Sequence, residues 1–164
     1  MDTAVSTTPR SDTLWGAAVS GAYASAATAL LFLVIDSVRG EPLQTASTLG
    51  SVVLLGQEPS SPGPFRVDMV ALYSLIHLGA FVLIGAAATR AYQTWDRLRT
   101  PVALALLLTI ALTGGVALVD ALFFPGIIWA IGPWAMLGGN VAAAVTMTWV
   151  LDSGLALGSS RSER

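Results

Sequence analysis

The sequence has no cysteine, no lysine and a single histidine, and each of these features removes a class of chemistry. A chain without cysteine forms no disulfide, thiolate zinc site or iron–sulfur cluster, and it has no cysteine nucleophile. The lack of lysine excludes a P-loop lysine and a Schiff base. Because His77 is the one histidine, no site built from several histidines of one chain is available. We predict no metal site.

Charge is also scarce, with 11% charged residues against about 25% in soluble domains. The net charge is −2 and no basic cluster is present, which argues against nucleic acid as a partner. Apolar residues make up 54% of the 164 residues, and the mean hydropathy is +0.72. This composition indicates a small integral membrane protein whose first partner is the lipid bilayer.

Catalytic signatures are missing as well. The sequence contains no Gly-x-Ser-x-Gly elbow, no dinucleotide fingerprint, no His-Glu-x-x-His and no pair of carboxylates within an apolar segment. A set of Ser74, His77 and Asp120 can be drawn on paper, but a serine and a histidine on one helix face are an ordinary occurrence. We therefore expect no enzymatic activity.

Four long apolar segments follow one another along the chain. A hydrocarbon core about 30 Å thick needs about 20 helical residues, and the segments that meet this requirement are 14–35, 68–92, 101–124 and 127–151. The sequence thus predicts an all-α membrane protein, a bundle of four transmembrane helices over residues 14–151. The fourth helix follows a tight turn at Phe124-Pro125-Gly126, and Pro133 lies in its first full turn or kinks it there. Alternatively, the helix starts at Pro133 and still spans.

The arginines are distributed unequally between the two sides of such a bundle. The tails 1–13 and 152–164 and the middle loop share one side, which carries Arg10, Arg90, Arg97, Arg99, Arg161 and Arg164. The opposite side has only Arg39 and Arg66, and acidic residues on or near it leave that surface net negative: Asp36, Glu41, Glu58, Asp68 and Asp120. The positive-inside rule predicts that both termini lie in the cytoplasm. Segment 14–35 is long enough to be an uncleaved signal anchor.

The outer loop 36–67 has two parts. Residues 41–57 are moderately apolar and too short to cross, so they predict a short interfacial helix capped by Thr45 or Ser47 and ended by Gly56. Residues 57–66 are rich in proline and predict an extended strap. The loop is interpreted as a connector that covers the helix ends, or alternatively as a docking surface or a lid over a cavity.

Three features of the sequence carry a resemblance to a protein family. They are the segment DSVRGEPLQTASTLGSVVLLG at 36–56, His77 in the second predicted helix, and Gly139-Asn140-Val-Ala-Ala-Ala in the fourth. Together they resemble a bacterial family of uncharacterised four-helix inner-membrane proteins, over roughly residues 14–151. The family often has proline before the serine of the outer loop, where this chain has Ala46, so the short helix is expected to start more loosely. The resemblance implies the four-helix architecture and a location in the bacterial inner (plasma) membrane, and it contributes nothing on activity.

Each predicted span carries one polar residue near mid-membrane depth, counted at 1.5 Å per residue. These residues are Thr28, His77, Thr113 and Asn140. They predict an intramembrane layer of hydrogen bonds that fixes the register of the helices, each bond contributing about 0.6 kcal/mol on average. The alternative for His77 is binding of a haem or chlorophyll-type pigment, or proton transfer.

Asp120 lies about one turn inside the outer end of the third predicted helix, near Trp129 and Trp134. We interpret it as an interfacial acid that reaches the membrane surface or accepts an indole N–H. The alternative is a proton or cation site.

Small residues recur every four positions in the first span, at Gly16, Ser20, Ala24 and Thr28, and glycine pairs occur at 114–115 and 138–139. They predict close helix packing inside the bundle or, alternatively, contact of the first helix with another subunit. The function these features favour is that of a non-enzymatic accessory or structural subunit of a larger membrane complex, held by other subunits or by self-association. An oligomeric transporter or channel for ions or small solutes, using His77, Asn140 and Asp120, is the alternative.

Overall fold

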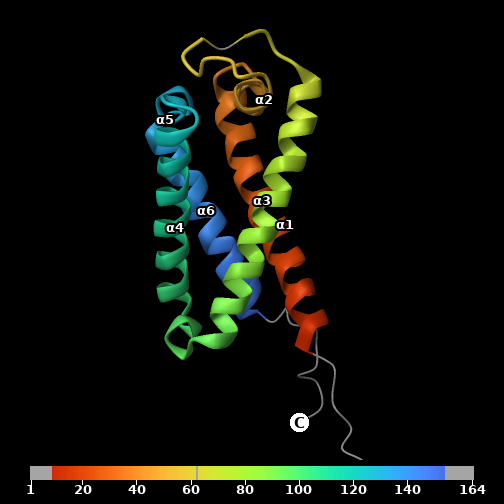
Figure 1. Cartoon of the computed structure of the whole chain (residues 1–164), viewed down its shortest axis with the longest axis vertical. Helices are drawn as coiled ribbons and strands as arrows, with labels where there is room; N and C mark the ends of the chain where they lie inside the picture. Colours follow the sequence, from red (N-terminus) through yellow and green to blue (C-terminus); the bar gives the residue numbers. More distant parts are fainter. Residues whose placement is uncertain (1–8, 62, 154–164) are drawn as a thin grey trace, which may run out of the picture.

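The structure, a computed structural model, describes residues 9–61 and 63–153, and this part of the chain is helical without any strand (Figure 1). Four helices are long and apolar enough to cross a membrane: α1 (Pro9–Val38), α3 (Val67–Thr94), α4 (Pro101–Leu122) and α6 (Pro133–Asp152). Three short elements connect them: α2 (Gln44–Leu55), the 3-10 helix η1 (Asp96–Arg99) and α5 (Ile127–Ile131). The predicted fold class, including the short helix between the first two spans, is confirmed.

Proline and glycine residues mark several of the helix ends. Pro101 and Pro133 occupy the first turns of α4 and α6. A backbone N–H at this position has no acceptor within the helix, so proline, which lacks the N–H, is tolerated there. Gly56 ends α2 with φ 67°, as predicted. α1 is already helical from Pro9, whereas the sequence placed residues 1–13 in a tail. Residues 1–8 and 154–164 of the two predicted tails lie outside the described residues.

The continuous helix expected over 127–151 is wrong, and the alternative start at Pro133 is the one observed. Gly132 has φ 99° and separates α5 from α6. A positive φ interrupts the helix, and Pro133 cannot donate the backbone hydrogen bond that would continue α5. Two helices therefore replace one, and α5 becomes part of the cap over one end of the bundle.

The four long helices pack in the order α3–α1–α6–α4. α1 contacts both α3 and α6, and α6 contacts α4, whereas α3 and α4 have no extensive contact although they are consecutive in the chain. In Figure 1 they meet near η1 and lie farther apart at the opposite end, where α2 packs against α3. We call these two ends of the molecule the η1 end and the α2 end.

Glycines bring α1 and α3 into backbone contact. A Cβ added to Gly21 would lie 2.5 Å from the carbonyl oxygen of Phe81, and one added to Gly85 would lie 2.6 Å from that of Ala17. The small-residue stripe of α1 is also buried, including Ser20 and Ala24. The stripe packs inside the bundle, as the first of the two interpretations predicted.

Candidate functional site

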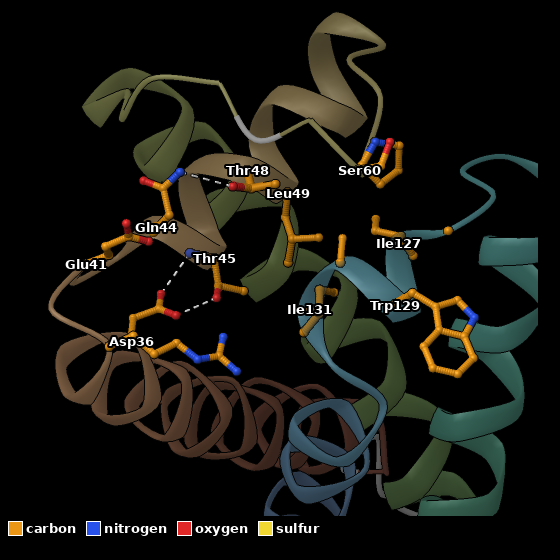
Figure 2. A pocket seen from close by; sticks show the side chains of 14 residues that line it. Asp36, Glu41, Gln44, Thr45, Thr48, Leu49, Ser60, Ile127, Trp129 and Ile131 are labelled. Carbon is orange, nitrogen blue, oxygen red and sulfur yellow. Dashed lines mark hydrogen bonds between the residues drawn. The ribbon is translucent and has the colours of Figure 1, made fainter.

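The α2 end of the molecule holds a large cavity of about 490 Å³ (Figure 2). It lies between the end of α1, the first turns of α2 and the short helix α5. Charged and polar residues on its α1 and α2 sides are Asp36, Arg39, Glu41, Gln44, Thr45 and Thr48. Ile127, Trp129 and Ile131 of α5 form an apolar wall opposite. Its volume falls within the range of about 300–1,000 Å³ that is typical of ligand sites.

Asp36 is the buried charged residue of this cavity, with 3% of its surface exposed. Its carboxylate accepts a hydrogen bond of 2.8 Å from the backbone N–H of Thr45 and one of 2.6 Å from the Thr45 hydroxyl, drawn as dashed lines in Figure 2. Asp36 at the end of α1 therefore caps the first turn of α2. Bonds of this kind to a charged acceptor are stronger than neutral ones.

The predicted caps of α2, Thr45 and Ser47, do not fill that role. The residue before the helix is Leu43, which has φ 66° and makes no side-chain capping bond. The hydroxyl of Ser47 instead accepts the backbone N–H of Arg66 at 2.8 Å, which ties α2 to the start of α3. By its position in the sequence, Asp36 is only one of the acidic residues on the outer face. Nothing local indicates that it reaches Thr45, because the intervening turn depends on positive φ values at Gly40 and Leu43.

A small cavity of about 140 Å³ lies between α1, α2 and α3. His77 lines it from α3, and its imidazole packs between two rings, with centroid distances of 4.6 Å to Phe81 and 5.7 Å to Tyr73. The backbone of Ser25 in α1 lies beside the imidazole. His77 Nε2 is buried and has no hydrogen-bond partner.

The two cavities share part of their lining. Asp36, Thr45 and Leu49 contribute to both. The hydrogen-bonded pair of Asp36 and Thr45, together with the side chain of Leu49, thus forms the wall between a polar space at the α2 end and an apolar space that reaches His77.

Of the four predicted polar residues, Asn140 and Thr113 bond to each other, Thr28 bonds to backbone carbonyl oxygens, and His77 makes neither kind of bond with them. The Asn140 side-chain amide donates to the Thr113 hydroxyl at 3.2 Å, which joins α6 to α4. The Thr28 hydroxyl donates to the carbonyl oxygen of Gly139 at 3.3 Å, which joins α1 to α6. Neither bond reaches His77. The four residues thus lie at compatible depths, but the His77 side chain faces the small cavity between α1, α2 and α3.

Asp120 caps a helix. Its carboxylate accepts the backbone N–H of Ile128 at 2.9 Å, in the first turn of α5. Trp129 and Trp134, the expected indole donors, are 80% and 84% exposed, and no bond joins either of them to this acid. The role found is structural and parallels that of Asp36 at α2.

The size of the small cavity bears on what could lie beside His77. The small cavity beside His77, at about 140 Å³, is below the lower bound of about 300 Å³ that is typical of cofactor sites. Among residues 9–61 and 63–153, no three His, Asp or Glu side chains are grouped so that they could hold a metal ion.

Comparison with known proteins gives no further guide to the site: no family model, curated protein or solved structure matches the chain.

Proposed function

We propose that this integral membrane protein is a non-enzymatic accessory or structural subunit of a larger membrane complex. The observation that supports the proposal is the open face of α4. Along the membrane α4 packs against α6, and at its ends it meets only η1 and α5 to any extent. Near the middle of α4, a Cβ added to Gly114 or Gly115 would have no neighbouring atom within 4 Å.

Three other helical glycines of this fold have a clear use. Cβ positions built on Gly21, Gly50 and Gly85 would all come within 3 Å of a neighbouring helix backbone. Glycine destabilises a helix interior by about 1 kcal/mol relative to alanine, and in membranes it is favoured where two backbones approach closely. A helix of another subunit packed against Gly114 and Gly115 would give this pair the same role.

Purification in mild detergent tests the proposal. We expect a reproducible membrane partner or a defined homo-oligomer, which Gly114→Leu disrupts while the thermal unfolding of the subunit itself stays unchanged. Gly79→Leu is the matched control, because Gly79 is equally open but lies on α3. A monodisperse monomer without partners, or an assembly that tolerates Gly114→Leu as well as Gly79→Leu, would contradict the proposal. Mass measurement after cross-linking distinguishes a second copy from another protein.

The proposed orientation places the η1 end in the cytoplasm of a bacterial inner membrane. It is supported by Arg90, Arg97 and Arg99, which lie in the last turns of α3 and in η1. Because the chain has no cysteine, single cysteines give a clean test. A membrane-impermeant maleimide added to intact cells should label Glu58→Cys and leave Arg97→Cys unlabelled. The reverse pattern would overturn the orientation.

A second candidate function is passage of a small solute or ion through an oligomer. It is favoured by the large cavity, which places Asp36, Arg39 and Glu41 at one end of the bundle next to the space that contains His77. Reconstituted liposomes should then show a flux that His77→Phe abolishes. Liposomes that remain tight with the unmodified protein would exclude this function.

A further inference from the structure

The large cavity lies where the apolar spans end. The span Leu14–Val38 of α1 has 25 residues and is about 38 Å long at 1.5 Å per residue, more than the hydrocarbon core of about 30 Å. Arg39, the next residue, lines the cavity. Trp129 of the lining and the nearby Trp134 are 80% and 84% exposed, and exposed tryptophans are typical of the membrane interface. The cavity is thus at the level of the phospholipid headgroups.

Two opposite walls of this cavity differ in polarity. Asp36, Glu41 and Gln44 lie on one side, and Ile127 and Ile131 of α5 lie on the other, as Figure 2 shows. A purely apolar molecule would leave the charged wall without solvation, and a small inorganic ion would leave the apolar wall uncovered. The two walls together favour an occupant that is charged at one end and apolar at the other.

The charged wall has two side chains that are free to bind such an occupant. Asp36 is already bonded to Thr45. The exposed side chains of Arg39 and Glu41, by contrast, form no hydrogen bond or ion pair with any residue in the described ranges 9–61 and 63–153. A guanidinium matches the geometry of a phosphate and binds it through two hydrogen bonds. A carboxylate only accepts hydrogen bonds and so matches an ammonium group, which only donates them.

We propose that the large cavity binds the headgroup of a phospholipid that carries a primary ammonium group, a phosphatidylethanolamine. Its phosphate pairs with Arg39 and its ammonium group with Glu41. The glycerol end of the headgroup lies against the apolar wall of α5, and the acyl chains remain in the bilayer. The bound lipid contacts the connection between α1 and α2 on one side and α5 on the other. This site is independent of both functions proposed above.

Lipid titration followed by native mass spectrometry tests this assignment. The delipidated protein in detergent is titrated with phosphatidylethanolamine, phosphatidylglycerol and phosphatidylcholine of identical acyl chains. Phosphatidylethanolamine should bind at least fivefold more tightly than the other two, because phosphatidylglycerol has no ammonium group and the quaternary ammonium of phosphatidylcholine has no N–H. Arg39→Gln should weaken the binding of phosphatidylethanolamine at least tenfold. Glu41→Gln should remove the preference for phosphatidylethanolamine over phosphatidylglycerol.

Two variants at the same end of the molecule are the matched controls. Arg66 and Glu58 lie outside the lining of the large cavity, so Arg66→Gln and Glu58→Gln should leave the affinities and the preference unchanged. Equal affinities for the three lipids would overturn the proposal. A loss in Arg66→Gln as large as in Arg39→Gln would overturn it too, because lipid would then adhere through surface charge alone.

A water-soluble probe separates a lipid from a free phosphate compound. Phosphoethanolamine has the phosphate and the primary ammonium group but no acyl chain, so it should displace the lipid only at concentrations at least a hundredfold higher than the lipid itself requires. Displacement at equal concentration would show that the cavity takes a soluble zwitterion, and the lipid would be excluded as its specific occupant. Arg39 and Glu41 are exposed, so their variants should retain the far-UV circular dichroism of the unmodified protein.

Discussion

The contact between α1 and α3 predicts opposite effects for one substitution at two places on the same helix. Gly79 and Gly85 both lie within α3. A Cβ added to Gly79 would have no neighbouring atom within 4 Å, whereas one added to Gly85 would lie 2.6 Å from the Ala17 carbonyl oxygen and 2.9 Å from the Gly21 nitrogen. Both obstructing atoms belong to the α1 backbone, so no side-chain rotation relieves the clash.

The size of the effect follows from these distances. Restoring ordinary contact at Gly85→Ala requires the two helices to separate by roughly 0.8 Å, and a gap of this size forfeits a quarter to a half of the dispersion energy of each pair contact. Overpacking of this kind typically destabilises by about 1–3 kcal/mol, against which the better helix propensity of alanine returns at most about 1 kcal/mol. We expect Gly85→Ala to lower the free energy of unfolding by about 1–2 kcal/mol. Gly79→Ala should leave it unchanged or raise it by up to about 1 kcal/mol.

The assay is reversible unfolding in mixed micelles by titration with SDS, followed by far-UV circular dichroism. Gly21→Ala provides a second measurement from the other side of the contact, since its Cβ would lie 2.5 Å from the Phe81 carbonyl oxygen. It should destabilise like Gly85→Ala. Equal unfolding curves for Gly79→Ala and Gly85→Ala would show that α1 and α3 do not approach as closely as described, and would refute the reasoning.

Two further predictions concern hydrogen bonds between elements. Asp36→Ala should destabilise the docking of α2 by about 1–3 kcal/mol, because it removes both bonds to Thr45. Thr45→Val should have a smaller effect, because it keeps the bond from the backbone N–H. Hydrogen exchange of the α2 amides measures both effects, and unchanged protection in Asp36→Ala would argue against the cap. Asn140→Leu and Thr113→Val should each destabilise the folded protein by about 0.6 kcal/mol, rising to nearly 2 kcal/mol at most. SDS titration of the double variant should show no additional loss of stability. Additive losses would mean that the two side chains act independently.

The long helices could be predicted because one variable, the length of the apolar run, determines whether a segment spans. The start of α6 could not be fixed in the same way, since the run is apolar on both sides of Pro133 and both starting points leave enough residues to cross. The choice is made by Gly132 at φ 99°, which lets α5 turn away from α6. That conformation depends on packing at the α2 end, where Ile127 contacts α2 residues in a small apolar cluster.

The candidate site was predictable only in part, because counting residues gives depth but not direction. Asn140 and Thr113 lie at matching depth and also face each other. His77 has a comparable depth, but its side chain lies between α1, α2 and α3. The capping role of Asp36 could not be predicted for a different reason. Its partner Thr45 is nine residues away and is reached through a turn whose shape the sequence does not determine.

The small cavity and the open face of α4 lie on different helices, and this separation has a measurable consequence. The small cavity is built from α1, α2 and α3, whereas the open face belongs to α4, which is joined to the rest of the bundle mainly through α6. Substitutions at distant sites without shared partners have nearly additive effects. Gly114→Leu and His77→Phe should therefore have additive effects on the free energy of unfolding, and His77→Phe should leave the assembly intact. A double variant whose loss of stability departs from the sum of the single losses by more than about 0.5 kcal/mol would mean that the contact between α1 and α6 couples the two regions.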